Sequence, residues 1–184
     1  CSSDLYDRAI LLSLYDRTKL DFLNLKTGEV DKVIKNNFED ITFFHLIQLD
    51  DDHILFIFDY GTETLYIYKN LEYISHIHLP AEDAPMISYK SIGIVGDYLI
   101  IGGANVSTKV FQFNNDFTKF ELIQSIEPTK IIRRISTYTS KNGVPTFVLI
   151  AHYNGEIYEL VNDRFEKTGV IEIKDIQKII YYKI

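Results

Sequence analysis

The chain has 184 residues, of which 46% are hydrophobic and 24% charged, a composition typical of a soluble domain with one substantial core. Its formal net charge of −7 argues against a broad nucleic-acid interface, which requires a basic face. No apolar run approaches the roughly 18 residues that a transmembrane helix needs. The 13 tyrosines and 12 phenylalanines, with no sustained helical periodicity, predict an all-β fold.

The first predicted unit, 8–35, contains the segment whose plan the later units repeat. In KLDFLNLKTGEV, residues 19–30, apolar and polar residues alternate up to a turn at Lys26-Thr27-Gly28. Gly28 supplies the positive φ that such a turn requires. We expect strands over 9–15, 19–25 and 29–35.

Three further units follow in the chain. They are predicted over 42–79, 89–126 and 131–173, each with short strands separated by turns rich in Gly, Asn and Asp. A last strand is predicted over 177–184. Pro80 and Pro85 bracket a loop, because proline cannot donate to a central strand ladder.

The spacing of the units indicates the architecture. The final apolar residues of the third strands recur in steps of about 45 residues, the repeat length of propeller blades; they are Leu25, Tyr68, Phe113 and Val161. A single unit cannot bury both faces of its sheet, so neighbouring units must stack. We therefore predict one domain, 1–184, built as a β-propeller of about four four-stranded blades. Either 177–184 pairs with 9–15 and closes the ring, or the chain is part of a larger propeller.

Four stretches also resemble the blades of known propeller families. They are KLDFLNLKTGEV, DHILFIFDYGTETLYIY (52–68), GDYLIIGGANVSTKVFQF (96–113) and NGEIYELVNDRF (154–165). The first looks like the third strand and Thr-Gly turn of WD40-type blades, and the second is similar to NHL-type propellers. The resemblance implies a β-propeller repeat protein. The chain has no tryptophan, and so no Trp-Asp signature, and the subfamily is not assigned.

Motifs that carry chemistry are scarce. His76 and His78 are two residues apart and share one face of a strand, which makes them weak metal candidates if a third ligand approaches. A solvated face of an outer strand is the simpler interpretation. The turn 50–52 has three aspartates but lacks the spacing of a calcium loop. There is no phosphate-binding loop, nucleophile elbow or dinucleotide fingerprint, so we predict no enzyme activity and no cofactor.

The single cysteine, Cys1, stands at the start of the chain and excludes an intrachain disulfide. Cys-Ser-Ser-Asp would suit the lipid-bearing start of a mature bacterial lipoprotein, although an arbitrary starting point of the sequence is favoured over that reading. An intracellular location is correspondingly favoured, with an extracytoplasmic lipoprotein as the alternative.

We expect the function to be a non-catalytic platform for other protein subunits, with no nucleic-acid partner. In a propeller, the loops that join second to third strands share one rim, and loops on a rigid scaffold commonly carry binding residues. The predicted rim residues are Asp16, Arg17, Tyr60, Thr62, Glu63, Asn105, Tyr153 and Asn154. One alternative is a ligand- or sugar-binding lipoprotein anchored through Cys1. Another is a hydrolase or lyase with acidic and histidine side chains around a central channel.

Overall fold

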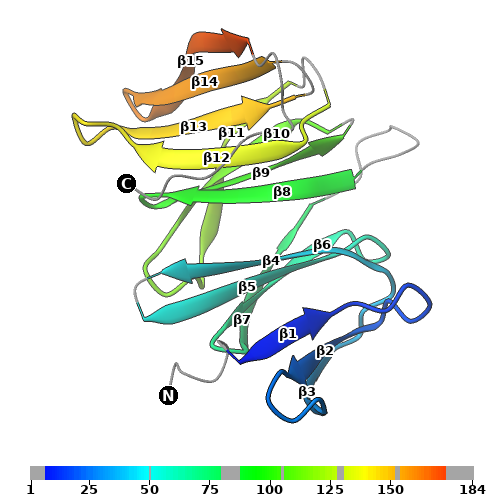
Figure 1. Ribbon diagram of the computed structural model, residues 1–184. Coiled ribbons are helices and arrows are strands. Elements are labelled where there is room, and N and C mark those ends of the chain that lie inside the picture. The colour runs from blue at the N-terminus through cyan, green and yellow to red at the C-terminus, as the bar shows by residue number, and fades with distance from the viewer. Residues whose placement is uncertain are drawn as a thin grey trace. The chain divides into compact units, whose positions relative to one another are not determined.

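A computed structural model describes residues 7–49, 51–79, 88–104, 106–127, 131–151 and 154–172 of the chain (Figure 1). These residues form fifteen β-strands and no helix, which confirms the all-β prediction. No membrane-spanning helix is therefore found among them. The chain divides into two compact units, Cys1–Ala81 and Glu82–Ile184.

The first unit contains two antiparallel sheets whose strands follow chain order. One sheet consists of β1 (Arg8–Leu11), β2 (Lys19–Asn24) and β3 (Val30–Lys35). The other consists of β4 (Ile41–Leu49), β5 (Asp52–Asp59), β6 (Thr64–Lys69) and β7 (Glu72–His78). Within the described residues, the first sheet therefore has three strands, and β1 and β3 are its edges.

The second unit contains two four-stranded antiparallel sheets with the same connectivity. One is formed by β8 (Ser88–Val95), β9 (Tyr98–Ala104), β10 (Thr108–Phe113) and β11 (Phe120–Ile126). The other is formed by β12 (Arg134–Thr139), β13 (Pro145–Ile150), β14 (Asn154–Val161) and β15 (Arg164–Glu172).

One irregularity recurs at the same place in all four sheets. The pairing between the last two strands of each sheet shifts by one residue, after Phe22, Ile67, Val110 and Ile157. The extra residue lies in the last strand; in β7, for example, it is Ile74. Such bulges bend the strand and increase its twist. Their recurrence supports the repeat that the sequence spacing predicts.

The core of the first unit is formed by both of its sheets. Leu20 and Phe22 alternate along β2, as predicted, and pack in one cluster with Leu55 and Ile57 of β5. All four side chains are fully buried. Burying a side chain of this size stabilises the fold by about 1.5–3 kcal/mol, so this cluster contributes to holding the two sheets together.

In the second unit, packing and hydrogen bonds both join the two sheets. Phe147 and Phe165 pack with Ile100 in the shared cluster. The Gln124 side chain of β11 donates to the Phe165 carbonyl oxygen and accepts from the Phe165 N–H, both at 2.9 Å. Gly93 of β8 allows close approach, because a Cβ there would lie 2.6 Å from the Thr137 Cγ2 atom of β12.

The turn after β2 confirms the local prediction. Gly28 has φ +74°, and its N–H donates to the Asn24 carbonyl oxygen at 2.8 Å. The Asn24 side-chain oxygen accepts from the backbone N–H groups of Lys26 and Thr27. The turn is thus closed by its own residues.

Two of the predicted strand boundaries that bear on the rim are wrong. β1 ends at Leu11 rather than at residue 15, because the Ser13 hydroxyl accepts from the N–H groups of Tyr15 and Asp16 at 3.2 and 3.1 Å. Side-chain acceptors of this kind compete with a strand ladder. Asn154, which the sequence places in a turn, is the first residue of β14 and pairs with Glu172.

Several predictions fall on residues outside the described ranges. They concern Cys1, the loop between Pro80 and Pro85, Asn105, Tyr153 and the closing strand 177–184. The single domain 1–184 and the closure of a ring stay predictions.

Candidate functional site

The first unit places three connections at the same ends of its strands. They are the loop after β1 (12–18), the link after β3 (36–40) and the loop after β5 (60–63). Within each antiparallel sheet, alternate strands end on the same side. Backbone hydrogen bonds from Ile41 to Arg17 and from Tyr60 to Asp40 join the three connections across the two sheets. We call this set of loops the first-unit rim. It contains the predicted residues Asp16, Arg17, Tyr60, Thr62 and Glu63.

Asp59, at the end of β5, organises two of these loops. Its side chain is fully buried, and its carboxylate accepts four hydrogen bonds. The donors are the N–H groups of Glu39 (3.0 Å), Asp40 (2.7 Å) and Gly61 (3.2 Å) and the Thr62 hydroxyl (2.9 Å). A buried carboxylate needs such donors to offset its lost hydration. The link 36–40 and the loop 60–63 are therefore held together by one side chain.

Asp40 connects this network to the loop after β1. Its side chain forms an ion pair with Arg17 at 3.2 Å, and its carbonyl oxygen accepts from the Tyr60 N–H at 2.8 Å. The Ile41 N–H in turn donates to the Arg17 carbonyl oxygen at 2.8 Å. The two predicted turns of this unit thus meet at the residues between β3 and β4, a link that sequence reasoning did not assign to the site.

Asp16 has a local role. Its carboxylate accepts from the Thr18 hydroxyl at 2.6 Å and from the Thr18 N–H at 3.2 Å. These hydrogen bonds lower the pKa of Asp16 below 3.8, with smaller contributions from the charges of Lys19 and Lys35. The side chain therefore fixes the turn.

The first-unit rim exposes apolar surface. Tyr15 is fully exposed, Leu14 is 81% exposed and Tyr60 is 43% exposed. Leu14 and Tyr15 were missed because the sequence placed them in a strand. The sequence signal that could have found them is the Asp16-Arg17-Thr18 turn directly after them, because residues that lead into a turn can lie outside the sheet and be exposed. Tyrosine and arginine are enriched among residues that dominate binding energy at interfaces.

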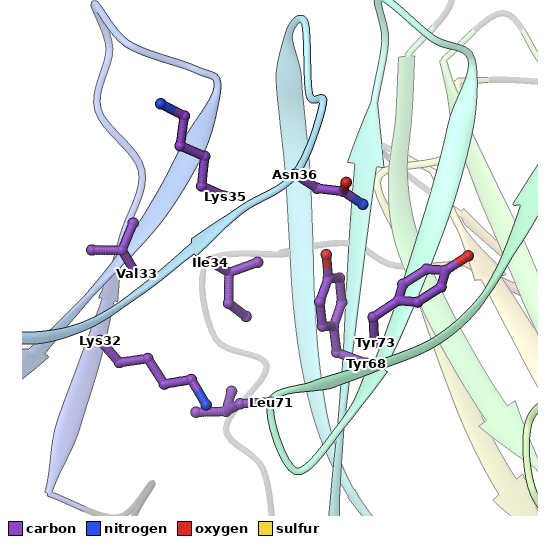
Figure 2. A pocket seen from close by; sticks show the side chains of 8 residues that line it. All are labelled: Lys32, Val33, Ile34, Lys35, Asn36, Tyr68, Leu71 and Tyr73. Atoms are coloured by element: carbon purple, nitrogen blue, oxygen red, sulfur yellow. The ribbon is translucent and has the colours of Figure 1, made fainter.

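A groove of about 540 Å³ opens elsewhere in the same unit (Figure 2). Its lining residues come from β3, the residue that follows it, β6, the β6–β7 turn and β7. They are Lys32, Val33, Ile34, Lys35, Asn36, Tyr68, Leu71 and Tyr73. We call this the β3 groove. Ile34, Tyr68 and Leu71 are buried, whereas half of Tyr73 is exposed.

Two tyrosines form one wall of the β3 groove. The rings of Tyr68 and Tyr73 meet edge to face, with centroids 5.7 Å apart. Burial raises the pKa of Tyr68 to about 12, and a hydrogen bond with the Asn36 side chain acts in the opposite direction. The Tyr73 hydroxyl lies 2.8 Å from His76 Nδ1. Both rings are thus held in place before any ligand binds.

Leu71 has an unusual backbone conformation. It follows Asn70 in the turn between β6 and β7, and its φ is +66°. Residues with a Cβ avoid this left-handed region at a cost of about 1–2 kcal/mol. Leu71 nevertheless stays there, with its side chain buried in the core cluster and at the groove.

The metal candidates do not form a centre with other described residues. His76 and His78 lie on β7, an edge strand, and both are exposed, as the simpler interpretation predicts. No group of three or more His, Cys, Asp or Glu side chains that could hold a metal ion is found in the described ranges. Asp52 instead pairs with Lys69 at 2.6 Å.

In the second unit, the remaining predicted rim residue is Asn154. Its carbonyl oxygen accepts from the Ala151 N–H at 2.9 Å, which closes the connection between β13 and β14. The nearby Glu156 carboxylate accepts from the Tyr158 hydroxyl at 3.0 Å and pairs with Lys167 at 2.6 Å. This buried group ties β14 to β15.

Comparisons with known proteins identify the fold. No protein-family model matches the chain, and no curated protein matches its sequence. Among solved structures, the chain is similar to BBS1N, which was crystallised in complex with ARL6DN and soaked with mercury. That match has a TM-score of 0.59 and 12% identity, and it covers 91% of this chain and 54% of the other.

A second solved structure is the WD40 domain of SCAP from fission yeast. Its TM-score is 0.60 at 11% identity, over 90% of this chain and 42% of the other. WD40 domains are β-propellers. The chain has a propeller-like fold. It spans about half, or less, of the length of these two solved chains. The predicted fold class is confirmed, while identities this low leave the subfamily open.

Proposed function

We propose that this chain is a non-catalytic protein-binding part of a larger assembly, and that a partner protein docks on the predicted rim. The observation that carries the proposal is the first-unit rim itself. Exposed Leu14, Tyr15 and Tyr60 lie on loops that Asp59 and Asp40 hold in place. Loops fixed in advance lose less conformational entropy on binding, which favours affinity.

The composition of the first-unit rim suits a protein partner. Tyrosine provides rigid apolar area with a hydroxyl that can form hydrogen bonds. Arg17, on the same loop as Tyr15, is exposed and adds a planar donor group to this rim. The similarity to BBS1N, a domain solved in complex with another protein, supports the proposal at the level of the fold. The other predicted rim residues, Asn105, Tyr153 and Asn154, belong to the second unit and stay predictions.

The test begins with chemical crosslinking and affinity purification of the intact chain from its native source, which identifies a partner. Binding of that partner is then measured for Tyr15→Ala and Tyr60→Ala. Tyr138→Ala is the matched control, because Tyr138 is 45% exposed and lies outside the predicted rim. We expect each rim variant to weaken binding by about 2 kcal/mol, the scale of a binding hot spot, and the control to bind normally.

The opposite ends of the strands provide the contradicting outcome. The turns at Thr27 and Asn70 lie there. If Thr27→Ala or Asn70→Ala abolished partner binding while the rim variants left it intact, the proposed surface would be wrong.

A further inference from the structure

The β3 groove follows an edge strand. Five of its eight lining residues are consecutive, from Lys32 to Asn36, and β3 is the last strand of its sheet. The outer backbone groups of an edge strand are unpaired within the sheet, and an extended peptide can pair with them. The groove therefore has the direction and the backbone donors and acceptors that suit a peptide.

The charge of the β3 groove differs from that of the whole chain. The chain carries a formal charge of −7, yet the groove is lined by Lys32 and Lys35 and by no acidic residue. In the described ranges neither lysine has an ion-pair partner within 4.0 Å. The charge of Lys35 also makes a small contribution to lowering the pKa of Asp16.

Lysines on edge strands commonly serve only to keep other strands away. The position of Lys32 favours a binding role instead. Lys32 and Ile34 are two residues apart and share one face of β3, and Figure 2 shows the Lys32 amine directed toward Leu71. The Lys35 side chain points away from Leu71 in the same view. Lys32 is half-buried, so its charge meets a ligand in a partly desolvated setting, where ion pairs are stronger than in water.

We propose that the β3 groove binds an extended acidic peptide segment of a partner protein. An apolar side chain of the peptide packs on Leu71 and the exposed ring of Tyr73, and a carboxylate pairs with the Lys32 amine. The edge-to-face contact with Tyr68 and the hydrogen bond to His76 hold the Tyr73 ring in position. This surface shares only Asn36 with the first-unit rim. Lys32, Leu71 and Tyr73 lie outside that rim, so either proposal can fail without the other.

The probe is a fluorescein-labelled ten-residue peptide of alternating Leu and Glu, measured by fluorescence anisotropy on the full 184-residue chain. Two further peptides replace Glu by Lys, or Leu by Ser. We expect the Leu-Glu peptide alone to bind the native chain. Lys32→Glu should weaken its binding by about tenfold or more, and Lys32→Gln by a smaller factor, because a desolvated charge pair is lost.

Charge reversal distinguishes pairing from a structural role. The Leu-Lys peptide should bind the Lys32→Glu variant more tightly than it binds the native chain. Lys141→Glu makes the same change of charge at an exposed turn of the second unit, and it should bind the Leu-Glu peptide within about twofold of the native chain, as expected for a remote exposed charge. Thermal unfolding of each variant verifies that it is folded.

Several results would overturn the proposal. One is absence of binding by the Leu-Glu peptide, and another is equal binding to the native chain and to both Lys32 variants. If Arg17→Ala weakened binding and the Lys32 variants did not, the peptide would occupy the first-unit rim. If light scattering showed self-association that Lys32→Glu abolished, the occupant would be a second copy of the chain.

Discussion

Leu71 offers a direct test of the packing that shapes the β3 groove. The side chain is 9% exposed, and its backbone has φ +66°. Leu71→Ala removes buried apolar contacts but keeps the Cβ that disfavours this conformation. Truncations of buried leucine cost about 2–5 kcal/mol. Because Leu71 lies at the edge of the core, we expect about 2–3 kcal/mol, at the low end of that range.

Leu71→Gly removes the same side chain and also relieves the left-handed backbone. Glycine adopts positive φ without the Cβ penalty of about 1–2 kcal/mol, and part of that gain is offset by its greater freedom in the unfolded chain. We therefore expect Leu71→Gly to be more stable than Leu71→Ala by about 0.5–1 kcal/mol.

Urea denaturation, followed by tyrosine fluorescence and circular dichroism, measures both variants. Leu65 of β6 is the control, because it is 1% exposed and is not among the residues with positive φ. At Leu65 we expect the alanine variant to be more stable than the glycine variant, since glycine in a strand weakens it. If Leu71→Ala equalled or exceeded Leu71→Gly in stability, the inference that packing holds Leu71 in the left-handed region would be refuted.

Two further predictions concern buried polar groups. Each carboxylate oxygen of Asp59 accepts from two donors, and Asp59→Asn replaces one of these oxygens by an NH₂ group. Two donors then lose their acceptor, and we expect the free energy of unfolding to fall by about 2–4 kcal/mol. Asp52 is only partly buried and pairs with Lys69 near the surface, so Asp52→Asn should change the urea midpoint little. An equal effect of the two variants would contradict the role of Asp59. For pH, burial and the hydrogen bond to a carboxylate raise the pKa of Tyr158 to about 12 from 10.0. The unfolded chain ionises first, so stability is full below pH 10 and falls as the pH rises to about 12. Denaturation midpoints should fall less steeply with rising pH in Tyr158→Phe than in the native chain. Burial also raises the pKa of Tyr68, so the double variant Tyr158→Phe/Tyr68→Phe removes both groups. If its midpoints fell with pH as steeply as those of the native chain, tyrosine ionisation would be refuted as the cause.

Local signals in the sequence predicted much of the fold correctly. The alternation of Leu20 and Phe22 identified a strand with one buried face, and Gly28 marked a turn that needs positive φ. The spacing of about 45 residues indicated four similar units. Such features depend on neighbouring residues and on a repeated period, both of which a single sequence displays.

The error at β1 also has a local cause. The run 9–15 is apolar enough for a strand, but the Ser13 hydroxyl captures two backbone N–H groups and ends the ladder. A serine at position 13 is compatible both with a strand that continues to residue 15 and with a turn that ends the strand at Leu11. Only the surrounding packing decides which one is adopted, and with it the exposure of Leu14 and Tyr15.

The sequence by itself determined an all-β chain of repeated strands, the positions of most turns and an overall negative charge. Only the tertiary structure decided which distant residues meet. Asp59 accepts from residues about 20 positions earlier in the chain, and the β3 groove joins Lys32 to Leu71. These contacts arise when separate sheets bury a common core, a long-range effect that leaves no periodic trace in the sequence. For the same reason, the packing of Leu71 overrides its backbone preference.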